Sequence, residues 1–321
     1  MYHIPARLQT VLWTFQPLYA ILAAAKLREG CILNGWLIVN AFLETAKFRE
    51  IYAMLGKAAQ AENIRLEIKT PAEIMCPSGS DFSAFSLPDF AIFWDKDIYL
   101  AKRLEAAGLR LFNNADAVAA CDNKMLTAMA LSHAHVPAPL TFLSPKTFEG
   151  LGYCTLAFLD EAEKALGYPM VIKEACGSFG QQVYLAATRQ EAEAIIRRMG
   201  YKDFIMQQFV KTSIGRDIRV NVVGGKVAAC MLRYNPNDFR SNITNGGSMA
   251  PCQITPAQEE AALAACQVLG LDFAGVDVLF GENDAPLICE VNSNPHFKST
   301  LEATGVNLAG HILSHIRRAM A

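Results

Sequence analysis

The stretch Val276–Asn292, VDVLFGENDAPLICEVN, decides the fold of the chain's C-terminal part, because two apolar runs flank the turn sequence GENDAP. A turn over residues 281–286 pairs the runs as antiparallel strands, with partners 280/287, 279/288, 278/289 and 277/290. Asp277 then lies directly opposite Glu290. The two-residue period of a strand puts Asn292 on the same face. The sequence therefore predicts that two carboxylates and an amide share one surface.

Such a surface needs a cation. Two carboxylates side by side repel each other and destabilise the strand pair. Oxygen ligands from two carboxylates and an amide suit Mg²⁺ or Mn²⁺, particularly where substrate phosphates supply further ligands. The alternative is a solvated hairpin face on which polar residues meet by chance. Phosphate-binding residues elsewhere in the chain favour the metal site.

The segment VIKEACGSFGQQVYL offers the first such residues. Lys173 lies inside an apolar strand, immediately before the loop Gly177–Gly180. Glycine lets backbone N–H groups point at anionic oxygens, and the lysine adds a positive charge near them. The spacing is neither a Walker nor a Rossmann signature, so an ordinary glycine hairpin remains the alternative.

Arginines inside apolar strands are a second signal. Arg219 and Arg233 lie in GRDIRVNVVGGKVAACMLRY, where a guanidinium is costly unless it meets a carboxylate or a phosphate. Arg240, Ser241 and Asn242 follow in DFRSNITNGGS, for which an exposed polar loop is the alternative.

Composition sets the outer limits. The chain has 321 residues, 52% of them hydrophobic and 19% charged, which predicts two or three domains. A net charge of -2 argues against a broad nucleic-acid interface. The nine cysteines are scattered without a Cys-x-x-Cys pair, which indicates small buried side chains in a reducing cytosol and hence a cytoplasmic protein. Cys289 is expected to face away from Glu290.

The pattern along the chain is mixed. Residues 34–114 alternate between strand and helix signals, which indicates a small parallel sheet covered by helices. A helical segment over Ala115–Ala134 follows, and from Tyr168 onward strands are joined by glycine turns. A helix capped by Thr255 and a closing helix over Asn307–Ala319 complete the pattern.

The first 33 residues differ from the rest. They contain the apolar run TVLWTFQPLYAILAAAKL, interrupted by Gln16 and Pro17. A packed amphipathic extension, or a segment upstream of the true start, is the favoured interpretation. A signal peptide or membrane anchor is the alternative.

Taken in order, these motifs resemble the ATP-grasp superfamily, and within it the RimK-type glutamate ligases. The resemblance spans roughly residues 115–318 and rests on seven collinear segments: DNK ending at Lys124, YPMVIKEACGSFGQQV, FIMQQFV, GRDIRVNVVGGKV, DFRSNITNGG, AGVDVL and CEVNSNPHF. It implies an α/β protein in which a parallel-sheet pre-ATP-grasp domain precedes an ATP-grasp fold of two α+β subdomains. The implied boundaries are 1–33 for the extension, 34–114, and 115–321 divided into 115–210 and 211–321.

The resemblance also implies roles for individual residues. ATP would be bound by Lys124, Lys173, Gly177, Ser178, Gly180, Gln181, Gln208, Phe209, Val210, Asp217, Arg240, Ser241 and Asn242. Two Mg²⁺ or Mn²⁺ ions would be held by Asp277, Glu290 and Asn292. The catalytic cations that stabilise the acyl phosphate would be Arg219, Arg233 and Arg240. Family members usually have Glu where this chain has Gln208.

The implied activity is an ATP-dependent carboxylate–amine ligase working through an acyl phosphate. It would join an amino acid such as L-glutamate to a peptide, a protein or a small-molecule carboxylate. A ligase for a different amine or a carrier protein, and a non-catalytic ATP-binding regulator, are the alternatives. Neither nucleic acid nor membrane is an expected partner, whereas self-association is.

Three histidines are further candidates for functional residues. His296 follows the proposed metal ligands and is expected to cap the next helix rather than to touch an acyl acceptor. His311 and His315 are spaced i,i+4 on the last helix but lack the glutamate of the H-E-x-x-H metal motif. They are expected to be surface or packed residues.

Overall fold

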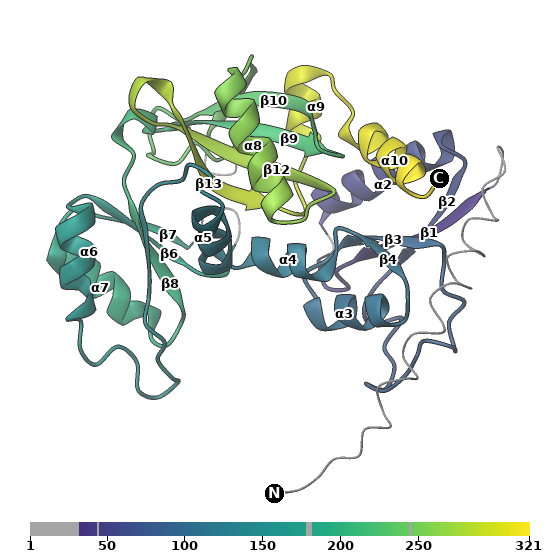
Figure 1. Cartoon of the computed structure of the whole chain (residues 1–321), viewed down its shortest axis with the longest axis horizontal. Helices are drawn as coiled ribbons and strands as arrows, with labels where there is room; N and C mark the ends of the chain where they lie inside the picture. Colours follow the sequence, from purple (N-terminus) through teal and green to yellow (C-terminus); the bar gives the residue numbers. More distant parts are fainter. Residues whose placement is uncertain (1–31, 44, 178–181, 244–245) are drawn as a thin grey trace, which may run out of the picture.

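The computed structural model describes residues 32–43, 45–177, 182–243 and 246–321 (Figure 1). Its strands form one four-stranded parallel sheet, one four-stranded antiparallel sheet and one five-stranded antiparallel sheet. The helices pack on the faces of these sheets, so the α/β fold with an α+β C-terminal part is confirmed.

The parallel sheet is N-terminal and has the strand order β2-β1-β3-β4. Its strands are β1 (Leu33–Val39), β2 (Ile64–Lys69), β3 (Phe90–Trp94) and β4 (Arg110–Phe112). Every residue of β3 is buried, as expected for a strand covered on both faces. Helices α2 (Ala46–Ala61) and α10 (Leu308–Ala319) cover one face, and α3 (Ile98–Ala106) covers the other (Figure 1).

The helical segment predicted over Ala115–Ala134 is two helices, α4 (Ala115–Asp122) and α5 (Lys124–His133). They are separated at Asn123, whose backbone is extended and whose side chain accepts a hydrogen bond from the N–H of Met125. Asn123 also forms an isolated β-bridge with Cys176. The break places Lys124 at the start of α5, where its ammonium reaches the carbonyl of Gly177.

The second sheet has the order β5-β8-β6-β7, all antiparallel. Its strands are β5 (Thr141–Leu143), β6 (Met170–Glu174), β7 (Val183–Ala186) and β8 (Phe204–Gln208). Helices α6 (Phe158–Leu166) and α7 (Arg189–Met199) share a core with it. This leaves the other face of the sheet to the candidate site.

The third sheet has the order β11-β10-β9-β12-β13, also antiparallel. It consists of β9 (Arg216–Val223), β10 (Lys226–Tyr234), β11 (Ser248–Pro251), β12 (Phe273–Phe280) and β13 (Pro286–Asn292). Helix α8 (Pro256–Val268) packs its alanines on one face, and the predicted cap at Thr255 is confirmed as a capping box with Gln258. Shorter elements are α9 (Lys298–Thr304) and the 3₁₀ turns η1 (Lys211–Ser213) and η3 (Glu282–Asp284).

The parallel sheet is fastened to the third sheet by a buried amide. Asn113, directly after β4, donates hydrogen bonds to the carbonyls of Phe273 and Ser293, both at 2.9 Å. Trp94 stacks on Phe273 with ring centroids 5.5 Å apart. Helix α10 shares the core of the parallel sheet although it closes the chain. The division at residue 114 stays a prediction, because this core takes residues from both sides of it.

In the described part of the chain, no helix has the length and apolar character needed to cross a bilayer. The extension predicted over residues 1–33 lies outside the described residues except for its last two.

Candidate active site

The hairpin of β12 and β13 places Asp277 opposite Glu290, as the sequence predicts. The other predicted pairs are wrong by one residue: Val278 faces Ile288, and Leu279 faces Leu287. The reason is a β-bulge that interrupts the strand pairing between Asp277 and Val278. Cys289, on the opposite strand, has no partner in the register.

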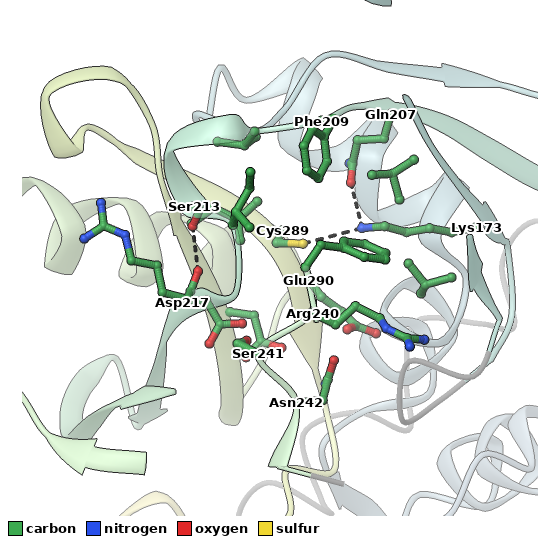
Figure 2. Close-up of a pocket in the computed structure, with 18 of the residues that line it drawn as sticks. Lys173, Gln207, Phe209, Ser213, Asp217, Arg240, Ser241, Asn242, Cys289 and Glu290 are labelled. Atoms are coloured by element: carbon green, nitrogen blue, oxygen red, sulfur yellow. Dashed lines mark hydrogen bonds between the residues drawn. The ribbon is translucent and has the colours of Figure 1, made fainter. Parts of the chain in front are cut away.

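The bulge also corrects the expected direction of Cys289. Its sulfur lies 3.5 Å from the ammonium nitrogen of Lys173, and it lines the same cavity as Glu290 (Figure 2). The extra residue breaks the alternation that would have turned Cys289 away. Burial raises the pKa of its thiol, so Cys289 is a neutral part of the wall.

This first cavity lies between the second and third sheets. It is lined by Lys124, Lys173, Gly177, Gln207, Gln208, Phe209, Val210, Asp217, Arg233, Arg240, Ser241, Asn242, Asp277, Cys289 and Glu290, among others. All the described residues that were predicted to bind ATP therefore line one cavity. Ser178, Gly180 and Gln181 lie outside the described residues.

Lys173 is held by a residue that the sequence analysis missed. Its ammonium donates to the amide oxygen of Gln207 at 2.7 Å, and both side chains are buried (Figure 2). The register aligns Val171 with Gln207, so Lys173 and Gln207 are diagonal neighbours on one face. An amide side chain inside the apolar strand sequence FIMQQ was the signal that could have identified Gln207. The neighbouring Gln208 was assigned to the site from the sequence, and Gln208 is exposed.

Lys124 joins this group from α5. Its ammonium donates to the carbonyl of Gly177 at 3.1 Å and lies 3.8 Å from a carboxylate oxygen of Glu290. A cation from one helix thus connects Gly177 with Glu290.

The two strand arginines are part of a buried charge network. Arg233 donates to both oxygens of Asp217, at 2.7 and 2.6 Å, and also approaches Asp277 at 3.0 Å. Arg219 donates a bidentate pair of hydrogen bonds to the two carboxylate oxygens of Asp277. Two arginines and two aspartates leave no net charge.

The network controls the ionisation of Asp277. Burial alone would raise the pKa of this carboxyl, but the neighbouring charges of Arg219 and Arg233 lower it below its usual range. Asp277 is therefore anionic at neutral pH, as a metal ligand must be.

A metal ion fits the chemistry of this surface. Asp277, Glu290 and Asn292 all line a second cavity of about 600 Å³, and the amide of Asn292 is oriented by a hydrogen bond from its nitrogen to the carbonyl of Gly275 at 3.3 Å. No three His, Cys, Asp or Glu side chains of the described residues gather into a metal-binding group. A cation here would depend on the Asn292 oxygen, which suits a hard ion such as Mg²⁺.

The second cavity lies between the third sheet and the parallel sheet. The parallel-sheet side contributes Asn40, Lys47, Phe48, Tyr52, Trp94, Asp95 and Lys96 to its lining, and the C-terminal side contributes Asn294, His296, Lys298 and Glu302. The prediction that His296 caps the next helix is wrong, because α9 has Phe297 at its N-cap and no side-chain cap. The ring of His296 packs edge-on against Phe48 instead, and its pKa is lowered to about 4 by burial and by Lys47.

The last-helix histidines behave as expected. His311 is exposed, whereas His315 packs edge-on against Phe112 and lies 3.2 Å from a carboxylate oxygen of Asp272.

Comparison with known proteins decides the family. The model of the RimK-like ATP-grasp domain matches residues 121–316. The chain belongs to the RimK-like ATP-grasp family. It is therefore an ATP-binding ligase of the kind that forms carbon–nitrogen bonds.

Individual relatives agree with this assignment. The chain is 30% identical to an uncharacterized protein, the MG012 homolog of Mycoplasma pneumoniae, over 86% of this chain and 96% of that protein. It is 38% identical to a probable alpha-L-glutamate ligase of Pseudomonas fluorescens, over 68% of this chain and 70% of that protein. The fold is similar to a RimK-domain ATP-grasp protein of Sphaerobacter thermophilus, with a TM-score of 0.66, 22% identity and coverage of 88% and 98%.

Proposed function

We propose that this RimK-like enzyme activates a carboxylate by phosphorylation and joins it to the amino group of an amino acid, with L-glutamate as the leading candidate. The observation that carries the proposal is the position of Asp277 and Glu290, which line both cavities at once. A nucleotide bound beside Lys173 would direct its terminal phosphate toward the cavity that can hold the other substrates. The name of the Pseudomonas relative supports L-glutamate.

The proposed reaction has two steps. A carboxylate oxygen of the acceptor attacks the γ-phosphorus of ATP, which forms an acyl phosphate and releases ADP. The amine nitrogen then attacks the acyl carbon, the carbon–oxygen bond to phosphate breaks, and an amide forms with loss of a proton. The acceptor is a peptide, a protein or a small-molecule carboxylate.

The chain's residues would act mainly by positioning and electrostatics. Lys124 and Lys173 would bind phosphate oxygens, and Arg240, Ser241 and Asn242 line the same cavity. Arg219 and Arg233 would face the acyl phosphate while Asp217 and Asp277 fix their orientation. One or two Mg²⁺ or Mn²⁺ ions, held by Asp277, Glu290 and Asn292, would supply charge neutralisation on the phosphates.

The direct test is a screen for ADP release from ATP and Mg²⁺ with pairs of amino acids and carboxylates. The expected result is release that requires both an amino acid and a carboxylate, with amide formation confirmed by mass spectrometry. Release that ignores both would leave only an ATPase, and no release with any pair would favour the non-catalytic regulator.

A variant tests the metal assignment in the same assay. Glu290→Ala should reduce Mg²⁺-dependent turnover at least 100-fold while the melting temperature stays within about 2 °C, since its side chain is one-third exposed. Glu282→Ala is the matched control, because this carboxylate lies in the η3 turn outside both cavities. Near-normal turnover of Glu290→Ala would remove Glu290 from the metal site.

A further inference from the structure

Three polar atoms in the wall of the second cavity are buried without a hydrogen-bond partner among the described residues. They are Oδ2 of Asp95, Oδ1 of Asn294 and Nε2 of His296, and all three residues line the cavity. Buried polar atoms are nearly always satisfied, so unpartnered atoms on three residues that line one cavity point to a ligand or to ordered water there.

Asp95 is the acidic member of the group, and burial raises the pKa of its carboxyl. It follows β3 at the carboxyl edge of the parallel sheet, where open α/β sheets commonly bind ligands. Its side chain is 5% exposed, and its Oδ1 accepts from the main-chain N–H groups of Lys96 and Asp97. Oδ1 is therefore fixed by the backbone, the side chain of Asn40 also interacts with this carboxylate, and Oδ2 has no partner within hydrogen-bond distance.

The other two atoms are also acceptors. The side-chain N–H of Asn294 donates a hydrogen bond to the main-chain oxygen of Asp95 at 3.2 Å, and the side-chain oxygen of Asn294 has no partner. The ring of His296 also has a hydrogen bond to the main chain of Lys47. This bond opposes the lowering of the His296 pKa, as expected when a ring N–H donates to a carbonyl oxygen. In a neutral imidazole the second nitrogen is then an acceptor. Burial and the positive charges of Lys47, Arg219 and Lys298 lower the pKa of His296 to about 4, so the ring is neutral at pH 7.

A carboxylate and two neutral acceptors call for a donor-rich cation. A primary ammonium has three N–H donors and no acceptor, and its charge balances that of Asp95. We infer that Asp95, Asn294 and His296 form the subsite that binds the amino group of the amino-acid substrate. This inference rests on the proposed ligase function and says where, in this chain, the amine is recognised.

The subsite also suits the proposed direction of attack. Trp94, Asp95, Asp277, Glu290 and His296 line one continuous cavity, so an amine held at its parallel-sheet side shares that space with the carboxylate surface. Phe48 and Trp94 add aromatic walls to the same cavity, and aromatic faces attract cations.

Calorimetric titration of the full chain, with ADP and Mg²⁺ present, tests the subsite without requiring turnover. The probes are L-glutamate and glutarate, which differ only in the amino group. Wild type should bind L-glutamate at least 10-fold more tightly than glutarate. Asp95→Asn and His296→Phe should each weaken L-glutamate binding about 10- to 100-fold, as loss of a hydrogen bond to a charged group does, and change glutarate binding less than twofold.

Asp116→Asn is the matched control, because its carboxylate is 87% exposed on α4, and it should leave both affinities unchanged. Melting curves of each variant check that it is folded. If Asp95→Asn does not fold, His296→Phe still tests the subsite, because a phenylalanine ring can keep the packing against Phe48. Equal binding of L-glutamate and glutarate by wild type, or unchanged L-glutamate binding by both variants, would overturn the subsite.

Comparison with the ADP assay separates the two proposals. ADP release on L-glutamate that is insensitive to Asp95→Asn would keep the ligase and remove the subsite. L-glutamate binding that depends on Asp95, without ADP release under any condition, would keep the subsite and remove the ligase.

Discussion

The substitution Asp217→Asn tests how much the buried network of two arginines and two aspartates contributes to the stability of the folded chain. Asp217 and Arg233 are 7% and 5% exposed, and their side chains are joined by two hydrogen bonds. Replacing the carboxylate by an amide leaves two buried guanidinium groups and the single carboxylate of Asp277. Removing one partner of a buried ion pair costs about 3–5 kcal/mol.

That cost predicts a measurable shift in melting temperature. For a folded unit of about 150–250 residues, each kcal/mol lowers the melting temperature by about 2–4 °C, so Asp217→Asn should lower it by about 6–20 °C. Differential scanning calorimetry at pH 7 measures this value.

Asp238→Asn supplies the comparison, because it breaks an Arg240 ion pair whose side chains are 27% and 23% exposed. Exposed pairs contribute about 1 kcal/mol or less, so this variant should melt within about 4 °C of wild type. Equal shifts for the two variants, or a shift below 3 °C for Asp217→Asn, would refute the argument that burial makes the Asp217 pair the more important one.

Two further predictions concern the same surface. Lys173→Met should raise the KM for ATP about 10- to 100-fold through loss of a charge-assisted phosphate contact, measured by initial rates of ADP release, whereas Lys202→Met, an exposed lysine paired with Glu174, should not. The pKa of Asp277 is lowered in the folded chain, so its stabilising effect is complete above the pKa of an unfolded aspartate, about 3.9, and disappears as the pH falls through the lower folded value. Melting curves from pH 2 to 7 should therefore fall less steeply toward acid for Asp277→Asn than for wild type, and parallel curves would contradict this.

Features that depend on residue periodicity and turn chemistry can be predicted from the sequence. Features that depend on irregular backbone, such as helix breaks and β-bulges, cannot. The strands of the parallel sheet, the Thr255 cap and the Asp277–Glu290 pair follow from apolar alternation and turn position. The break at Asn123 does not, because the helical pattern continues through it and an isolated bridge to Cys176 interrupts the helix.

Two β-bulges explain much of the remaining difference. The Gly224–Gly225 turn pairs Val223 with Lys226, and an unbroken ladder from there would place Asp217 opposite Leu232. A register shift after Val227 brings Asp217 opposite Arg233 instead. The β12–β13 hairpin likewise gains one residue at Cys289. Neither bulge carries a signal in the local sequence, yet each sets which charged side chains meet.

The amine subsite was missed for a different reason. Asp95 ends a strand in FAIFWD, where a terminal polar residue is common, and Asn294 and His296 lie 199 and 201 residues farther along the chain. Only the packing of the parallel sheet on the third sheet, through Asn113, brings them to one cavity. No local pattern can report such a meeting.

The arrangement of the two cavities indicates a role for the parallel sheet in the proposed reaction. The second and third sheets alone form the first cavity, where we propose that the nucleotide binds and where Lys173 and the charge network lie. The opposite side of the carboxylate surface would be open to water without the parallel sheet, and water competes with an amine for an acyl phosphate. Helix α2 and strand β3 line this side with Phe48 and Trp94, and Asp95 lies beside them. The elements that cover this side therefore also carry Asp95 of the proposed amine subsite, so substitutions along this edge of the sheet are the ones expected to change amine specificity without changing ATP binding.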